Sequence, residues 1–238
     1  MTDFIFQHGA MVGGFVWDEL IEAIAVQSGG DARCMTLDVP GCGEKRGRDV
    51  REMSFDAIID DLLADVDASG MSDVVLVGHS QGGTVLPRLA EARPELFRKL
   101  IYIACLGPDP GQSVMEAAQA GKLDEDQDVA AVTIMESLRT MLCNDMDVPT
   151  TRNFLARLGG GDAWPPSSYS EPGWRYDHLK DVPSTYIFCE QDTCVPPAKQ
   201  EAYLANLHID RVVRIDSGHQ PMNSRPEELA RIILAEGG

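Results

Sequence analysis

Three residues that could form a nucleophilic catalytic site occur along the chain in the order Ser80, Asp192 and His219. A serine hydroxyl is a weak nucleophile at neutral pH and needs a base within hydrogen-bonding reach. A histidine titrates near physiological pH, so it can take the serine proton and return it to a leaving group. An aspartate beside the histidine fixes its tautomer and stabilises the imidazolium. If the fold brings the three together, they predict acyl transfer through a serine.

The sequence around Ser80 is the most specific signal in the chain. An apolar run rich in β-branched residues, 74–77, is typical of a strand buried on both faces. The motif Gly-His-Ser-Gln-Gly-Gly at 78–83 follows directly, and a helical stretch at 84–92 comes next. A serine at such a strand-to-helix turn sits in a strained backbone, which the glycines around it can accommodate. The alternative is an ordinary turn that happens to contain a serine.

Asp192 and His219 also follow predicted strands, at 184–189 and 211–215. In an open parallel sheet, ligands bind outside the carboxyl ends of the strands, so residues that follow different strands can meet there. The order Ser, Asp, His is also the one expected when a strand–serine–helix turn supplies the nucleophile. These positions therefore favour Asp192 as the acid and His219 as the base.

Each of these assignments has an alternative. Asp192 is also typical of a turn or helix cap, in which case Glu190 or Asp216 would be the acid. His219 has the alternative of an ordinary loop histidine. Its place directly after the last predicted strand favours the catalytic interpretation.

Backbone N–H groups near Ser80 are predicted to bind the negative charge that develops during acyl transfer. They belong to Gln81, directly after the serine, and to Ala10, in the loop after the first predicted strand. His8 and His79 flank this predicted oxyanion hole. We interpret both histidines as hydrogen-bonding supports beside the substrate pocket rather than as bases.

The elements that must position these residues alternate between strand and helix. We expect six strands, beginning near 4, 32, 74, 100, 184 and 211, and helices at 17–27, 54–67, 84–92, 197–207 and 226–235. Ser54 is the predicted N-cap of the second helix and Gly70 its end. Strands separated by helices and joined by right-handed crossovers imply an α/β fold with a mostly parallel six-stranded sheet flanked by helices.

The alternation breaks between residues 112 and 177. Helical patterns occur at 129–142 and 151–158, without a convincing strand. We therefore predict a helical cap, 112–177, inserted into a core formed by 1–111 and 178–238.

Two irregular stretches and three aromatic residues stand out within this predicted cap. The acidic run 124–128 is interpreted as a solvated face. The three glycines at 159–161 do not form a phosphate loop, because no strand precedes them and no lysine follows at the required spacing. Trp164, Tyr169 and Trp174 are candidates to line a substrate pocket, although such aromatics equally form the small core of a cap.

Composition narrows the class of protein. The 238 residues suffice for one α/β domain, and the net charge of −18 argues against nucleic acid and anionic membranes as partners. No apolar run is long enough to span a bilayer, and the first residues lack the features of a signal peptide. We expect a cytoplasmic protein. An acidic surface disfavours indiscriminate self-association but permits a specific homodimer.

Disulfides and metal sites are not expected. Six cysteines in a chain without a secretory signal do not indicate a disulfide framework. Cys189 and Cys194 have four residues between them, and the five histidines show no ligand spacing. We therefore predict no metal.

With these residues assembled, the chain resembles the α/β-hydrolase superfamily along nearly its full length. Within that superfamily it is most similar to the branch of plant methylesterases, hydroxynitrile lyases and bacterial pyrethroid-type esterases. The resemblance is carried by His8-Gly9-Ala10 with Trp17, the motif at 78–83, Pro108-Asp109, residues 186–192 with Pro196, and residues 217–222 followed by 226–229.

The resemblance implies an α/β-hydrolase fold with a cap over the pocket, and a cofactor-free serine esterase acting on a small carboxylic ester. Relatives that cleave cyanohydrins carry a lysine just after the catalytic histidine, where this chain has Gln220, so the lyase activity is disfavoured. Haloalkane dehalogenases have aspartate in place of Ser80 and are excluded. The same set of residues also serves carbon–carbon, lactone and amide hydrolysis, and some relatives are weakly catalytic small-molecule receptors.

Overall fold

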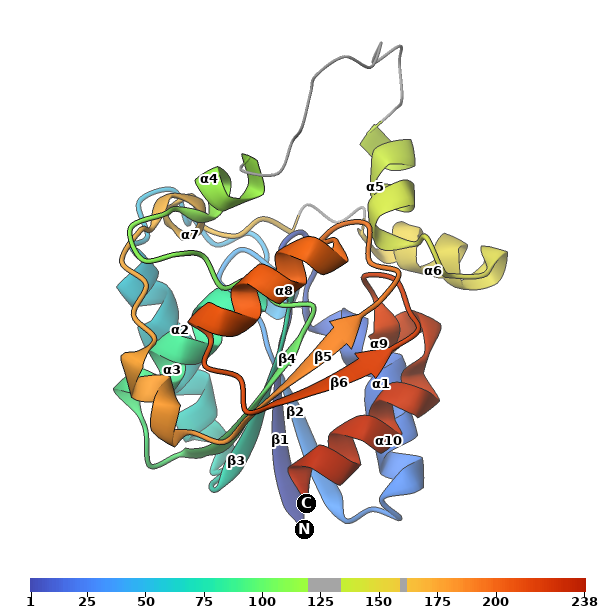
Figure 1. Ribbon diagram of the computed structural model, residues 1–238, viewed down its shortest axis with the longest axis horizontal. Helices are drawn as coiled ribbons and strands as arrows, with labels where there is room; N and C mark the ends of the chain where they lie inside the picture. The colour runs from blue at the N-terminus through green and yellow to red at the C-terminus, as the bar shows by residue number, and fades with distance from the viewer. Residues whose placement is uncertain (120–133, 159–161) are drawn as a thin grey trace.

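The computed structural model of this chain describes residues 1–119, 134–158 and 162–238. Six parallel strands form one sheet in the order β2-β1-β3-β4-β5-β6 (Figure 1). The strands are β1 (Thr2–Gln7), β2 (Ala32–Leu37), β3 (Val74–His79), β4 (Phe97–Ile103), β5 (Ser184–Cys189) and β6 (Arg211–Ile215). The predicted α/β class with a six-stranded, parallel sheet is therefore confirmed.

The central strand β3 is buried along its whole length, as its continuous apolar sequence predicts. Because side chains alternate between the faces of a sheet, Leu76 packs into one hydrophobic cluster while Val75 and Val77 pack into the other. Two hydrophobic layers thus hold β3, and with it the serine that follows, in the middle of the molecule.

Helices cover both faces of the sheet (Figure 1). One face carries α2 (Phe55–Ser69), α3 (Val85–Ala92) and α8 (Pro197–Asn206). The other carries α1 (Asp18–Gln27), the short α9 (Pro221–Ser224) and α10 (Pro226–Gly237). The chain termini lie together at the amino ends of the strands.

Capping signals set the ends of α2 as the sequence predicts. The Ser54 hydroxyl accepts a hydrogen bond from the Ala57 N–H at 3.2 Å, and Gly70 ends the helix with φ of 63°.

Other boundaries differ from those predicted. The helices α1 and α3 begin one residue later than predicted, because 3₁₀ turns, Gly14–Trp17 and Ser80–Thr84, precede them. Strand β4 begins earlier, at Phe97, because that residue pairs with Val74 of β3.

Residues 112–177, which lie within the connection from β4 to β5, are called here the inserted segment. Its described helices are α4 (Val114–Gln119), α5 (Ile134–Leu142), α6 (Val148–Leu158) and α7 (Ser167–Ser170), and within its described residues no strand occurs. Figure 1 shows α4 to α7 at the end of the molecule where the strands terminate. The acidic run 124–128 and the glycines 159–161, to which sequence predictions were attached, lie outside the described residues.

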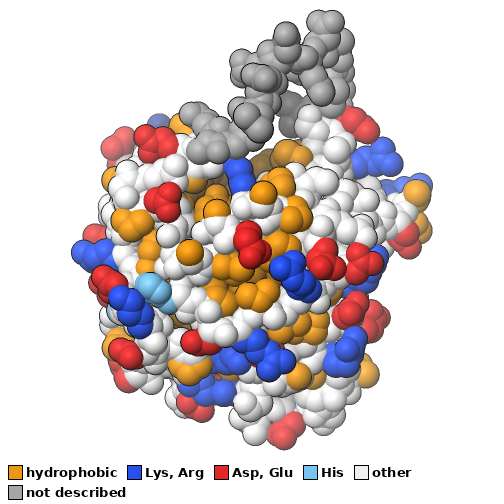
Figure 2. Space-filling model, viewed as in Figure 1, with side chains coloured by type: hydrophobic (Ala, Val, Ile, Leu, Met, Phe, Trp, Pro, Cys, Tyr) orange, Lys and Arg blue, Asp and Glu red, His pale blue; other side chains and the backbone are white. Residues whose placement is uncertain are grey.

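The surface is acidic overall but mixed in charge locally. On the face shown in Figure 2, Lys and Arg side chains are interspersed with Asp and Glu rather than collected in one stripe. Among the described residues, every helix is too short or too polar to reach across a lipid bilayer.

Candidate active site

Ser80, His219 and Asp192 form one chain of hydrogen bonds beyond the ends of three strands. The Ser80 Oγ lies 3.1 Å from Nε2 of His219, and Nδ1 of His219 lies 2.7 Å from Oδ2 of Asp192. Since a carboxylate can only accept, Nδ1 carries a proton, and once the ring is neutral Nε2 is left to accept from the serine hydroxyl. The neutral imidazole is thus held in the tautomer that a general base requires.

The turn at Ser80 is backbone-strained and closely packed. Ser80 has φ of 53°, a left-handed conformation that a residue with a side chain rarely adopts. A Cβ on Gly82 would lie 2.9 Å from the Gln7 carbonyl oxygen, and one on Gly78 would lie 2.6 Å from the Leu86 side chain. Both flanking positions therefore require glycine for the turn to fit between β1 and α3.

Asp192 is buried, and its second oxygen is occupied by backbone groups. Oδ1 accepts hydrogen bonds from the N–H groups of Cys194 and Val195, each at 2.8 Å. Of the two alternative acids, Glu190 lies near Arg214 on the surface and Asp216 accepts from the Gln191 amide. The carboxylate that the fold brings to His219 is that of Asp192.

The environment of His219 favours its protonated form. Burial by itself lowers the pKa of this imidazole, but the neighbouring Cys194 and the Asp192 carboxylate outweigh burial and raise its pKa well above the ordinary value. Cys194 was not predicted from the sequence. Its only signal is its position two residues after Asp192.

His79 supports the backbone of His219. Its Nε2–H donates to the His219 carbonyl oxygen at 2.8 Å, and the two rings lie 4.6 Å apart. Burial, together with the charge on His219, holds the pKa of His79 well below its ordinary value, so it is neutral. The Nε2–H of His79 is directed at the backbone of His219, so this ring acts on the geometry of the site rather than as the base.

His8, the first residue after β1, is likewise hydrogen-bonded to the backbone. Its Nε2 accepts the Val39 N–H at 3.2 Å, which leaves the proton on Nδ1, and Nδ1–H donates to the Gly9 carbonyl oxygen at 2.7 Å. Burial lowers the pKa of His8, so this ring is also neutral. A Cβ on Gly9 would lie 2.8 Å from Cβ of Ser80, so glycine lets this loop, and Ala10 with it, approach the nucleophile.

The three aromatic candidates of the inserted segment lie in different surroundings. Trp164 is buried and donates its indole N–H to the Gly9 carbonyl oxygen at 3.0 Å. Tyr169 packs against the core. Trp174 packs edge-on against Phe55, donates its N–H to the Gln112 carbonyl oxygen, and borders a surface pocket that no triad residue lines, so it is not part of the site. Of the three, Trp164 is the one that the structure connects to the predicted oxyanion loop.

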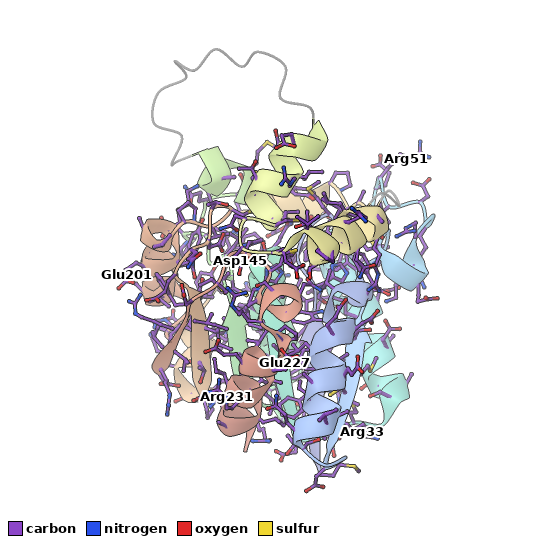
Figure 3. All side chains as sticks on the ribbon, turned by 90° about the vertical axis from the view of Figure 1, so that its right-hand side faces the viewer. Arg33, Arg51, Asp145, Glu201, Glu227 and Arg231 are labelled. Atoms are coloured by element: carbon purple, nitrogen blue, oxygen red, sulfur yellow. The ribbon has the colours of Figure 1, made fainter. Side chains whose placement is uncertain are left out.

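Two further residues of the inserted segment reach the site without having been predicted. Ser168 accepts a hydrogen bond from Nε2 of Gln81 at 3.2 Å, and both side chains are buried. Asp145 lies beneath the helices of the inserted segment, close to α9 (Figure 3), and its side chain faces Gly218, directly before His219. Neither contact leaves a sequence pattern, because each joins residues far apart in the chain.

The described residues hold no cluster of three or more His, Cys, Asp or Glu side chains arranged to bind a metal ion. The arrangement of Ser80, His219 and Asp192 offers a serine hydroxyl, a base and an acid. Together these three groups can transfer an acyl group to Ser80 and then to water.

Comparison with known proteins places this geometry in context. A model described as the alpha/beta hydrolase family matches residues 4–232. The chain is 28% identical over 214 residues to the "Probable hydrolase R7" of Phoma sp., covering 85% of this chain and 82% of that protein. It is 24% identical over 257 residues to the polyneuridine aldehyde esterase of Rauvolfia serpentina, covering 97% and 94%.

A solved structure gives the same architecture. The pyrethroid hydrolase from Sphingobium faniae JZ-2 superimposes with a TM-score of 0.75 at 22% identity, covering 99% of this chain and 97% of that one. At that identity the superposition establishes a shared fold.

Proposed function

This chain belongs to the α/β-hydrolase family, and from that premise we propose that it is a serine esterase, cleaving a small carboxylic ester through an acyl-Ser80 intermediate. The observation that carries the proposal is the hydrogen-bonded chain from Ser80 through His219 to Asp192. A serine hydroxyl bonded to a histidine, which is oriented in turn by a carboxylate, is the arrangement that activates an alcohol as a nucleophile.

In the first half of the reaction, Nε2 of His219 takes the Ser80 proton as Oγ attacks the ester carbonyl carbon. The carbonyl oxygen becomes negatively charged, and the N–H groups of Ala10 and Gln81 are proposed to stabilise it. The tetrahedral intermediate then collapses. His219 returns its proton to the departing alkoxide, so an alcohol leaves and the acyl group stays on Ser80.

Water completes the cycle by the same route in reverse. His219 takes a proton from the water as its oxygen attacks the acyl carbonyl, and the second tetrahedral intermediate expels Ser80. The proton on His219 passes to Oγ, so a carboxylic acid is released and the enzyme is regenerated. The Asp192 carboxylate stabilises the imidazolium in both halves.

The relatives support an ester as the substrate. The polyneuridine aldehyde esterase is named for ester cleavage, and it matches nearly the whole of this chain. Position 220, after the histidine, holds glutamine, which cannot supply the lysine ammonium of cyanohydrin-cleaving relatives. We propose that the inserted segment is the cap over Ser80, and that the enzyme works in the cytoplasm, where its six free thiols would stay reduced.

The test is hydrolysis of short-chain p-nitrophenyl esters by the wild type and by Ser80→Ala. We expect turnover by the wild type, and a fall in kcat of about 10⁴-fold or more in the variant. Mass spectrometry of the intact protein should detect the acyl adduct in the wild type alone. Equal hydrolysis by both proteins would refute the assignment of Ser80. Tight ligand binding without an acyl adduct would point to a receptor.

A further inference from the structure

The peptide group between Gly9 and Ala10 is held by its carbonyl oxygen, which lies on the side opposite to its N–H. Its carbonyl oxygen accepts two hydrogen bonds, from Nδ1 of His8 at 2.7 Å and from Nε1 of Trp164 at 3.0 Å. In a planar trans peptide the C=O and N–H groups point in opposite directions. Fixing the Gly9 carbonyl therefore fixes the direction in which the Ala10 N–H points.

The second peptide of the predicted oxyanion hole is held in the same way. The Ser80 carbonyl oxygen accepts the Leu106 N–H at 2.9 Å, which orients the Gln81 N–H in the opposite direction. The Gln81 side chain then donates to the Ser168 hydroxyl, which itself donates to the Pro165 carbonyl at 2.7 Å. Residues 164–168 of the inserted segment thus contact the Gly9 carbonyl of the first peptide and the side chain of Gln81, whose N–H belongs to the second.

The loop that carries Trp164 is anchored to the core directly before the indole. The fully buried Asp162 carboxylate accepts the Gly43 N–H at 2.8 Å and two hydrogen bonds from Arg46, at 3.1 and 2.7 Å. Ala163 contacts Gly41, whose φ of 96° and missing side chain allow the two backbones to meet. The position of the indole N–H is therefore set by the seating of this loop on the core.

The hydrogen bond from Trp164 to Gly9 is shielded from solvent. Trp164 is 2% exposed and His8 is fully buried, and the indole meets the imidazole edge-on at 5.8 Å. Hydrogen bonds are stronger where water is excluded, and an unpaired buried carbonyl is costly. Loss of the indole N–H would leave the Gly9 peptide free to tilt toward its single remaining donor, His8.

We propose that Trp164 is a positioning residue for the oxyanion hole, supported by Ser168. The indole N–H holds the Gly9 carbonyl and thereby aims the Ala10 N–H at the developing oxyanion. The inserted segment then does more than cover the substrate, because the oxyanion hole is complete only when residues 162–168 are seated on the core. This inference rests on the proposed acyl transfer at Ser80.

The experiment compares Trp164→Phe with Trp174→Phe. Both residues are buried tryptophans of the inserted segment, with an edge-on aromatic neighbour and an N–H donated to a backbone carbonyl, Gly9 in one case and Gln112 in the other. We expect Trp164→Phe to lower kcat by about tenfold or more, since removing one oxyanion donor outright costs about 10²–10³-fold. Its KM, and both constants of Trp174→Phe, should stay within about threefold of the wild type.

An aryl trifluoromethyl ketone, whose adduct with Ser80 carries an oxyanion, provides a second measurement. Its affinity should fall in Trp164→Phe by the same factor as kcat/KM and stay unchanged in Trp174→Phe. An unchanged kcat in Trp164→Phe, or a rise in KM alone, would overturn the proposal, because it would make the indole an ordinary wall of the pocket. Ser168→Ala, expected to lower kcat by a smaller factor, applies the same test if Trp164→Phe does not fold.

Crystal structures of the two variants separate this proposal from the proposed esterase activity. We expect the Gly9–Ala10 peptide to be rotated or in two orientations in Trp164→Phe, and unchanged in Trp174→Phe. A peptide that keeps its orientation in both refutes the positioning role, whether or not the wild type hydrolyses esters. A rotated peptide in a protein without esterase turnover would sustain the positioning role and reject the ester substrate.

Discussion

His219 must be neutral before its Nε2 can take the Ser80 proton, so its pKa sets the acid side of the pH–rate profile. Despite burial, Cys194 and Asp192 raise that pKa well above the ordinary histidine value. A raised pKa keeps the imidazole protonated, and therefore inactive as a base, up to a higher pH. We expect kcat/KM to rise with pH through an apparent pKa above about 6.5, measured with a p-nitrophenyl ester between about pH 5 and pH 9. An apparent pKa below about 6.5 would contradict the influence assigned to Cys194 and Asp192.

Asp192→Asn tests the acid directly. The amide can donate to His219 and so favour the wrong tautomer, and we expect kcat to fall by about 10⁴-fold. The residual activity should have its acid limb at lower pH, because the carboxylate no longer stabilises the imidazolium. Asp216→Asn is the matched control, since Asp216 is an alternative acid of the sequence but bonds to Gln191 instead. A large loss in the control, with a small one in Asp192→Asn, would reverse the assignment.

At the residue scale, the prediction of the three site residues depended mainly on their positions directly after strands. Ser80, Asp192 and His219 each follow a strand, and parallel strands deliver such residues to one edge of the sheet. The sequence favours Asp192 over its neighbours by position alone and does not show what orients its side chain. Asp192 and Glu190 differ by two positions, and only the turn after β5, in which Asp192 accepts two backbone N–H groups, directs one of them inward.

At the scale of elements, the inserted segment is fastened to the core through Asp162. This carboxylate is fully buried and accepts three hydrogen bonds from Gly43 and Arg46. Asp162→Ala leaves those donors without their acceptor, and we expect the free energy of unfolding to fall by about 2–3 kcal/mol. Because the same loop carries Trp164, kcat should fall as well. Urea unfolding and ester hydrolysis measure the two effects.

Asp49 and Arg51 form the same two-pronged ion pair on the surface, with side chains 65% and 81% exposed. Asp49→Ala should leave the urea midpoint and kcat unchanged, because solvent screens exposed pairs. If Asp49→Ala and Asp162→Ala changed the urea midpoint and kcat equally, burial of the Asp162 pair would have no effect on either. That result would refute the proposed anchoring by Asp162.

Periodicity explains why the core elements could be predicted from the sequence, whereas the inserted segment could be predicted only in outline. Buried strands and amphipathic helices repeat their apolar positions, as in 74–77 and along α2, so local sequence reveals them. The loop at 162–168 has no such repeat. It is held by contacts to residues 41–46, 9 and 81, all far away in the chain, and no local pattern encodes them.

At the scale of the whole molecule, one buried acid, Glu236, connects the last helix to three strands of the sheet. Its carboxylate on α10 accepts from Thr185 of β5 at 2.8 Å and pairs with Lys99 of β4 and Arg211 of β6. Burial raises the pKa of Glu236, but the Thr185 hydrogen bond and the Lys99 ammonium outweigh burial and hold the pKa below its ordinary value. A carboxyl with a lowered pKa stabilises the fold in its ionised form.

Glu236→Gln keeps the shape of the side chain and removes its charge, so we expect the free energy of unfolding at neutral pH to fall by about 2 kcal/mol. Glu228→Gln on the same helix, where the carboxylate is 44% exposed and 3.8 Å from Arg231, should change it by less than about 0.5 kcal/mol. The stabilisation by Glu236 is fully present above the unfolded pKa of about 4.3 and is lost as pH falls through the lower folded pKa. Urea unfolding should therefore show a gap between wild type and Glu236→Gln that is wide at neutral pH and closes in acid. A gap that persists in acid would mean that the charge of Glu236 is not what stabilises the contact of α10 with the three strands.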